Sequence, residues 1–333
     1  MAALVGARPG EIVFTSGATE SNVRAIRGAI AAVAERGGPR TFVTSHAEHA
    51  SVLALAARLG EEGLDVRRAG VDRAGRFDAG EVAALVPSAG AVVSVVATQP
   101  VTGAVEPVAE VAAALRGRAG VVLHSDAAQA VGRIPVDVRA LGVDLLSFSA
   151  HKLGGPPGVG ALFVREGTPF RAHDGGGSQE LGRRPGTESF ALAAGFGVAA
   201  ALAARDLRCE AERARRLLAP LRAFVGTTPG GEVLTPADGA LPNTLLVAFE
   251  GCSGETLLLL LDARGVRVST GTACTSGARR PADVLLAGGR TAADAARAVR
   301  VSTSWRTTAA DVERLCAAIG DALPRARAAA AST

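Results

Sequence analysis

One apolar segment near the middle of the chain ends in three polar residues that could do chemistry. Residues 143–152 read VDLLSFSAHK, so Ser149, His151 and Lys152 follow a buried strand. Ligands bind at the carboxyl ends of the strands in open α/β sheets. A lysine held there can lose its proton and attack a carbonyl carbon as an amine.

A second apolar segment places an acid in the same kind of position. Residues 121–129 read VVLHSDAAQ and deliver Asp126 and Gln129 after a strand. A lysine for a Schiff base and an aspartate for a pyridinium nitrogen are the two groups that pyridoxal phosphate needs from a protein. Taken singly, Lys152 could be a solvated lysine at a strand end and Asp126 a helix cap. Their pairing favours the cofactor.

The segment FTSGATES (14–21) combines a strand, a glycine turn and a helix start. Gly17, Ala18 and Thr19 would place backbone N–H groups and a hydroxyl at a helix N-terminus, where anions bind. The alternative is an ordinary capping turn with Glu20 as an acid in the first helical turn.

Two histidines, His46 and His49, lie three residues apart. That spacing suits metal ligands on a helix, but no second pair or nearby cysteine completes such a site, so we expect no metal. A ring stacked on a planar cofactor, or a general base, suits His49 better. A capping or core histidine is the alternative.

A glycine-rich segment, 175–189, surrounds Gln179, Arg183, Arg184 and Thr187. Such a loop can approach a phosphate closely, although a flexible linker has the same composition.

The four cysteines are widely spaced and form no CxxC pair, which favours free thiols in a reducing cytoplasm. Cys274 lies among glycines and hydroxyl residues, and Arg279 and Arg280 follow it, so we expect an exposed, reactive thiol. Cys252, in EGCSGE, is predicted to be a surface-turn thiol and is the main rival. Cys209 and Cys316 lie in predicted helices and are expected to be inert.

A charged residue, Arg300, falls in the middle of the predicted strand 298–302. A charge in that position is costly unless it meets an anion, and a bidentate grip on a substrate carboxylate would explain it. A structural ion pair is the alternative.

Predicted strands and helices alternate along the chain, and the alternation places most of these candidate residues directly after strands. Predicted strands are 12–16, 41–45, 91–97, 121–125, 143–149 and 160–164, then 243–249, 266–269 and 298–302. Predicted helices are 20–35, 50–59, 79–85, 107–116 and 189–223, then 254–264, 282–287 and 309–323. The pattern predicts an α/β fold with a mostly parallel sheet flanked by helices. We expect a large cofactor-binding domain over 1–200 and a smaller α/β domain over 201–330 that carries a mobile cysteine loop.

Composition excludes several classes of protein. The 333 residues carry 36 Lys and Arg against 32 Asp and Glu, a net charge of +4 without a basic block, so nucleic acid is not an expected partner. No predicted apolar segment is long enough to span a membrane, and a cytoplasmic location is expected.

Together these segments resemble the cysteine desulfurases of the class V aminotransferase family, which have the fold of type I pyridoxal-phosphate enzymes. The likeness covers nearly the whole chain. The matching motifs are FTSGATES, EHASVL, HSDAAQAVGRIPVDV, DLLSFSAHKLGGPPGVGALFVR, GGGSQELGRRPGT, LPNTLLVAF and VSTGTACTSG.

The resemblance implies roles for the site residues. Lys152 would bind the cofactor covalently, Asp126 would pair with its ring nitrogen, and His49 would stack on the ring and move protons. Cys274 would take the sulfur of L-cysteine as a persulfide for a sulfur-acceptor protein or small thiol, leaving L-alanine. The remaining contacts would come from Ala18, Thr19, Ser149 and His151 to the phosphate, Gln129 to the phenolic oxygen, Thr187 to a phosphate across a homodimer, and Arg300 to the substrate carboxylate.

This chain departs from the family pattern in two places. The family begins some tens of residues earlier with a segment close to DNAATT, and we expect that segment to be lacking here or to lie before a wrongly chosen start. A stretch like NNETG reads QPVTG here, so Pro100 replaces an asparagine beside the cofactor, Val101 replaces a glutamate, and Gln99 is a candidate to compensate. A related lyase or tailoring enzyme on another amino acid, or an inactive cofactor-binding scaffold, is the alternative function.

Overall fold

The computed structural model describes residues 1–38, 40–172, 174–270 and 282–331. The chain divides into two compact units. The first comprises Met1–Gly70, Phe77–Thr98 and Glu106–Leu207, and the second comprises Val71–Arg76, Gln99–Val105 and Arg208–Thr333. The two short segments of the second unit lie within the range that the sequence assigns to the first domain.

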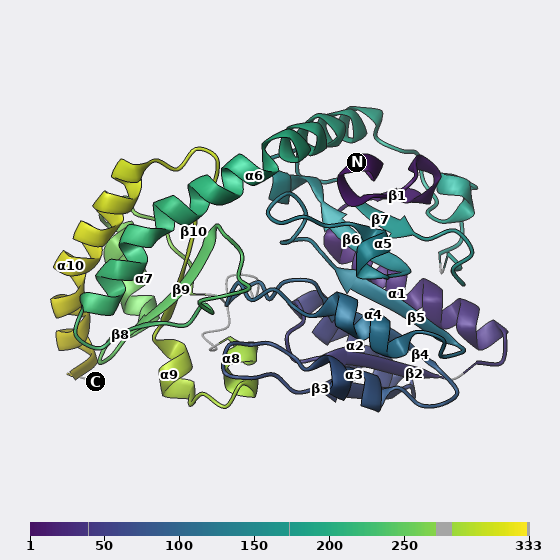
Figure 1. The fold of residues 1–333 in the computed structure, drawn as a ribbon, viewed down its shortest axis with the longest axis horizontal. Helices are drawn as coiled ribbons and strands as arrows, with labels where there is room; N and C mark the ends of the chain where they lie inside the picture. The colour runs from purple at the N-terminus through teal and green to yellow at the C-terminus, as the bar shows by residue number, and fades with distance from the viewer. Residues whose placement is uncertain (39, 173, 271–281, 332–333) are drawn as a thin grey trace. The chain divides into compact units, whose positions relative to one another are not determined.

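A seven-stranded sheet forms the centre of the first unit (Figure 1). Its strands, in spatial order, are β1 (Ile12–Thr15), β7 (Gly160–Val164), β6 (Leu145–Ser149), β5 (Val121–Asp126), β4 (Ala91–Val96), β2 (Thr41–Ser45) and β3 (Asp65–Ala69). Only β7 runs antiparallel to its neighbours. The predicted mostly parallel sheet is therefore confirmed, and the carboxyl ends of β1, β2, β4, β5 and β6 share one edge.

Helices flank this sheet, as predicted. They are α1 (Ala18–Glu35), α2 (Ala50–Glu61), α3 (Ala79–Leu85), α4 (Val108–Leu115) and α5 (Val138–Leu141). The longest of them, α1, packs against β4, β5, β6 and β7. Its buried Ala25, Ile26 and Ala29 recur at helical spacing and meet apolar strand residues such as Leu145 and Leu162. This packing fixes the N-terminus of α1 relative to the strand ends.

A long helix, α6 (Phe190–Thr227), contributes to both units. The second unit has an antiparallel sheet of β10 (Ala298–Ser302), β9 (Thr244–Phe249) and β8 (Gly231–Val233). Its other helices are α7 (Gly254–Asp262), α8 (Asp283–Ala287), α9 (Ala292–Ala296) and α10 (Ala309–Ala331). Val299 and Val301 enter the core formed with α6, α7 and α10, whereas Ala298 belongs to a second cluster that includes α8.

One predicted strand does not form, and four elements of the structure were not predicted. Residues 266–269 form no strand; only Ser269 pairs, as an isolated bridge to Arg300. The edge strand β3 was not predicted because its sequence, DVRRA, carries charges that an edge tolerates. The short elements α5, α9 and β8 contain three to five residues each, too few to show a period.

Candidate functional site

The predicted lysine and aspartate both lie at the carboxyl edge of the seven-stranded sheet. Asp126 is the last residue of β5 and is 4% exposed. Lys152 lies in a single 3-10 turn, Ala150–Leu153, that directly follows β6, the strand beside β5. The backbone carbonyl of Lys152 accepts a hydrogen bond from Arg133 at 2.8 Å, which fixes this turn to the segment after β5.

The carboxylate of Asp126 is held from two sides. One oxygen accepts the side-chain amide of Asn22 at 2.7 Å, and the other accepts the backbone N–H of Ala128 at 2.9 Å. Asn22 is fully buried on α1, so it approaches from a different element. Two donors leave the aspartate in a single orientation.

His49 is joined to the same group of residues. It is the N-cap residue of α2, and its Nδ1 accepts the backbone N–H of Ser51. A backbone N–H can only donate, so Nδ1 accepts and the neutral ring carries its proton on Nε2. The amide of Asn22 also donates to the Ser51 hydroxyl at 3.1 Å, so Asn22 links α2 to β5.

The N-terminus of α1 is open to an anion. Its N-cap residue is Gly17, and among the described residues no side chain caps it, so the first backbone N–H groups have no side-chain acceptor there. Ala18 is half-buried and Thr19 is exposed in this first turn. Gly160 lies so close that a Cβ there would be 2.6 Å from the backbone of Gly17.

Ser149 brings an unused hydroxyl to the same place. It ends β6 and pairs with Gly160, which touches Gly17. Its Oγ is buried and has no hydrogen-bond partner within the described residues. A buried hydroxyl without a partner is costly. An uncapped helix terminus beside such a hydroxyl fits the phosphate of pyridoxal phosphate.

His151 and Gln129 lie at the same edge but are held less firmly. His151 is exposed in the turn after β6, where partial burial and the charge of Lys152 lower its pKa. Gln129 is half-buried in the segment that follows β5.

Thr187 is exposed in the glycine-rich loop, which is tied to α1 by charged groups. Glu20, in the first turn of α1, accepts hydrogen bonds from Arg184 and from the buried Arg24. Arg24 also pairs with Asp174 at the start of the loop. Burial raises the pKa of Glu20, but the bonds from Arg184 and Ser16 outweigh it and lower the pKa to about 2.

Two further acid–base groups lie behind the strand ends, and the sequence analysis did not single them out. Glu48 is buried, its pKa is raised well above the ordinary value by burial, and it accepts the backbone N–H of Val96. His124 bridges the hydroxyls of Ser94 and Ser147 at 2.8 Å each, and burial lowers its pKa to about 3. The sequence gives little sign of either group, because Glu48 lies in the turn between His46 and His49, and His124 lies inside the apolar strand β5.

The remaining predicted residues lie in the second unit. Arg300 is in the middle of β10, as predicted, and is described below with its partners. Cys274 lies outside the described residues. The prediction for Cys252 is wrong, because this thiol is 3% exposed in the apolar core between β9 and α7, and burial raises its pKa.

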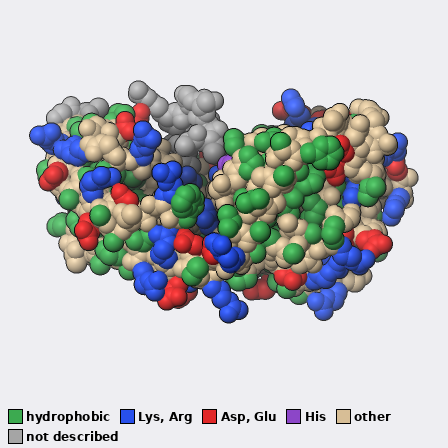
Figure 2. All heavy atoms as spheres, turned by 90° about the horizontal axis from the view of Figure 1, so that it is seen from above, with side chains coloured by type: hydrophobic (Ala, Val, Ile, Leu, Met, Phe, Trp, Pro, Cys, Tyr) green, Lys and Arg blue, Asp and Glu red, His purple; other side chains and the backbone are tan. Residues whose placement is uncertain are grey.

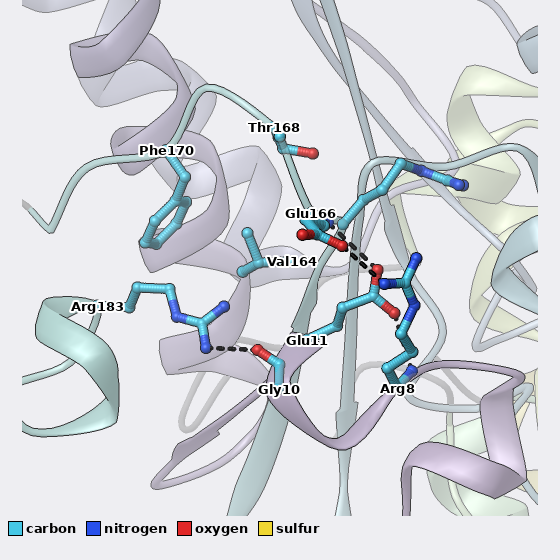
Figure 3. A pocket seen from close by; sticks show the side chains of 10 residues that line it. Arg8, Gly10, Glu11, Val164, Glu166, Thr168, Phe170 and Arg183 are labelled. Atoms are coloured by element: carbon cyan, nitrogen blue, oxygen red, sulfur yellow. Dashed lines mark hydrogen bonds and ion pairs between the residues drawn. The ribbon is translucent and has the colours of Figure 1, made fainter.

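A pocket in the first unit lies away from these groups (Figure 3). It is lined by Val164, at the end of β7, which pairs with the first residue of β6, so it lies at the opposite edge of the sheet. Its charged groups already pair: Glu11 accepts Arg139 and the backbone of Arg8, and Arg183 donates to the Gly10 carbonyl. We therefore assign the chemistry to the carboxyl edge instead.

Comparisons with known proteins show the family to which the chain is related. The family described as "Aminotransferase class-V" matches residues 1–315. A protein of Cereibacter sphaeroides named "Cysteine desulfurase" is 43% identical over 94% of this chain and 80% of its own length. "Cysteine desulfurase NifS" of Azotobacter vinelandii is 41% identical over 92% and 75%, respectively.

Solved structures show the same fold. A "NIFS-LIKE PROTEIN" superposes with a TM-score of 0.89 at 33% identity and covers 97% of this chain and 85% of that one. A structure titled "SspA in complex with cysteine" has a TM-score of 0.77 at 30% identity over 90% and 83%.

Proposed function

Since this chain belongs to the class V aminotransferase family, we propose that it is a cysteine desulfurase, an enzyme that uses pyridoxal phosphate to convert L-cysteine to L-alanine and enzyme-bound sulfur. The observation that carries the proposal is the grouping, at one sheet edge, of Lys152, Asp126 and the uncapped N-terminus of α1 beside Ser149. These are a covalent anchor, a partner for the ring nitrogen and a phosphate site.

Each end of the cofactor has a matching group in this chain. The N–H groups of Ala18 and Thr19, with the hydroxyls of Thr19 and Ser149 and the ring of His151, would hold the phosphate. Asp126, fixed by Asn22, would hold the ring nitrogen protonated, and Gln129 would donate to the phenolic oxygen. When bound, pyridoxal phosphate would supply an electron sink for the reacting carbon atoms of an amino-acid substrate.

Proton transfer falls to His49 and Lys152. His49 would stack on the ring, and the hydrogen bond from Ser51 fixes the tautomer in which Nε2 carries the proton. Lys152 would move a proton to and from the substrate carbon through its side-chain amine. Arg300 would bind the substrate carboxylate.

Sulfur would leave the substrate by attack of the Cys274 thiolate. The new S–S bond forms as the carbon–sulfur bond breaks, its electron pair passes to the carbon that becomes the methyl group of alanine, and that carbon takes a proton. Cys274 is left as a persulfide, which an acceptor protein or small thiol would remove. Burial of Cys252 excludes the main rival from this role, because a buried thiol with a raised pKa is a poor nucleophile.

A second copy of this chain is the partner that the surface of α6 fits. Phe190, Val198 and Leu202 share one face of the helix, and their exposed fractions are 80%, 62% and 45%. Figure 2 shows hydrophobic side chains gathered on one part of the surface. Thr187 lies three residues before Phe190, the first residue of this face. A homodimer that covers the face would therefore bring Thr187 of one chain close to the second chain.

The same helix is long and apolar enough to cross a membrane by length and composition, which is weak evidence for a span. We propose a cytoplasmic homodimer instead, because the C-terminal half of α6 carries buried residues of the second core, Leu218, Leu221 and Val225. Light scattering of the purified chain should give twice its mass without detergent. A monomer that needs detergent to stay dispersed would favour the membrane.

The function is tested by product analysis. Purified protein with pyridoxal phosphate should form L-alanine from L-cysteine in the presence of a reducing thiol, and Lys152→Ala should form none. Arg118→Lys, which changes an arginine that donates to the Ala83 carbonyl before the start of β5, should retain activity and serves as the control for folding. A wild type that binds the cofactor but forms no alanine from cysteine would contradict the proposal.

A further inference from the structure

The turn Gln99–Gly103 is held closed by its own hydrogen bonds. The side-chain oxygen of Gln99 accepts the backbone N–H groups of Val101 and Thr102, at 2.5 and 2.9 Å. The backbone N–H of Gly103 donates to the Gln99 carbonyl at 2.9 Å, and Gly103 has a φ of 78°, which favours glycine. Pro100 has no N–H to satisfy, and its ring restricts φ. The second residue of this turn is therefore held rigidly.

The carbonyl of Pro100 is directed at Arg300. It accepts a hydrogen bond from Nη1 of Arg300 at 2.8 Å. The backbone of Arg300 is fixed on both sides, by Leu246 of β9 and by two hydrogen bonds with Ser269. A neutral carbonyl orients a guanidinium through a hydrogen bond without adding an opposite charge of its own.

Val101 anchors the turn to the strand that carries Arg300. Its side chain is 8% exposed and packs in the cluster that contains Val284 and Leu285 of α8 and Ala298 of β10. A carboxylate could not be buried at this position without a paired charge. The apolar residue at 101 and the rigid residue at 100 therefore act together.

We propose that Pro100 is a positioning residue that sets the orientation of Arg300 toward the substrate carboxylate. The proposal rests on the proposed function only in taking Arg300 as the carboxylate ligand. Where the family pattern has an asparagine beside the cofactor, this chain has a proline whose main-chain carbonyl accepts a hydrogen bond from Arg300. Gln99, the candidate to compensate for the lost asparagine, has its side-chain oxygen on this turn, where it accepts the N–H groups of Val101 and Thr102.

The test compares a ligand that has a carboxylate with one that lacks it. The holoenzyme is titrated with L-alanine and with ethylamine, and dissociation constants are taken from the absorption change of the bound cofactor. Pro100→Gly keeps the carbonyl but frees the turn, so a smaller fraction of molecules presents Arg300 correctly. We expect the constant for L-alanine to rise roughly two- to fivefold, the range of a lost proline restraint, and that for ethylamine to stay unchanged.

Pro87→Gly is the matched control. Pro87 is also half-buried in a turn and its carbonyl also accepts one hydrogen bond, from Gly90, but it lies in the first unit. It should change neither constant. In the Arg300→Lys background, Pro100→Gly should add no further loss for L-alanine, because the group that it positions is gone. Alanine restricts the turn more than glycine does, so Pro100→Ala should lower the affinity for L-alanine by a smaller factor than Pro100→Gly. It replaces Pro100→Gly if that variant does not fold.

Three results would overturn the proposal. They are equal weakening of both ligands by Pro100→Gly, full additivity with Arg300→Lys, and a wild type that binds L-alanine no better than ethylamine. Failure of the proposed function would give a different result. In that case the wild type forms no alanine from cysteine, which refutes the desulfurase. If Pro100→Gly still weakens binding of L-alanine but not of ethylamine, the role of Pro100 stands.

Discussion

The side-chain amide of Asn22 donates to the carboxylate of Asp126 at 2.7 Å, across 104 positions of sequence. The same nitrogen donates to Ser51, whose backbone N–H binds the ring of His49. One asparagine on α1 thus connects the residue expected beside the ring nitrogen to the residue expected on the ring face. Its two N–H bonds fix both groups before a cofactor enters.

Replacing this asparagine should weaken both the fold and the site. Asn22→Ala leaves the buried Asp126 with one donor fewer, and a hydrogen bond to a charged group contributes about 1.5–3 kcal/mol. We expect a loss of stability in that range and at least tenfold weaker cofactor binding, measured by urea unfolding and by titration with pyridoxal phosphate. Asn243→Ala removes another buried asparagine, in the second unit, and should lower stability without changing cofactor affinity. Equal cofactor affinity in Asn22→Ala and wild type would refute the link.

Ser149→Ala should have opposite effects on the empty and the loaded protein. The Ser149 hydroxyl is buried without a partner in the part of the chain that the structure describes, so its removal should leave the apo-protein as stable as before, or more stable by about 1 kcal/mol. Cofactor affinity should fall, since a phosphate ligand is lost. Ser125→Ala is the control, because its hydroxyl is also buried and has no partner among the described residues, but it lies on the other face of β5 from Asp126. If both variants bind the cofactor alike, Ser149 does not hold the phosphate.

His124 should make the protein sensitive to acid. Its pKa is lowered by burial from 6.5 to about 3, so below pH 6.5 the unfolded chain takes up a proton that the folded protein refuses. Stability from this group is complete above pH 6.5 and falls by about 1.4 kcal/mol for each pH unit below it, until pH approaches 3. His124→Gln keeps polar contacts and should remove this slope. The raised pKa of Glu48 changes stability with pH in the opposite direction. Its effect is the same in the wild type and in His124→Gln, so it cancels when the two stability curves are subtracted. Parallel stability curves between pH 6.5 and 4.5 would show that His124 is not the cause.

The anchor of the glycine-rich loop should depend on one carboxylate. Glu20→Gln removes the charge that Arg184 and Arg24 share, so residues 174–188 should be cut by protease faster than in the wild type. Glu62→Gln, at an exposed pair with Arg27, should not change cleavage of the loop. An unchanged cleavage rate in Glu20→Gln would mean that other contacts hold the loop.

The sequence predicts the strand ends well because a buried parallel strand is a continuous apolar run, and polar residues after it stand out. This pattern located Asp126, Ser149 and Lys152 within a residue or two. It could not locate Asn22 or Ser51, because their importance lies in a contact between separate helices. Cys252 was misjudged because the turn sequence EGCSGE gives no sign that the thiol side packs inward. Strand β3 could not be predicted because its charged sequence is compatible with a strand only at the edge of the sheet.

The central claim is that Cys274 carries the sulfur removed from L-cysteine, and it is tested by locating that sulfur on the protein. Enzyme loaded with cofactor is given L-cysteine without a reducing thiol, alkylated, digested and mapped by mass spectrometry. Cys252 should be alkylated only after unfolding, since it is buried, and exposed Cys209 should carry the alkyl group alone. We predict one additional sulfur atom on Cys274, formed with an equal amount of L-alanine, and loss of both in Cys274→Ala. Alanine formation undiminished in Cys274→Ala, or the additional sulfur on Cys252, would contradict the account.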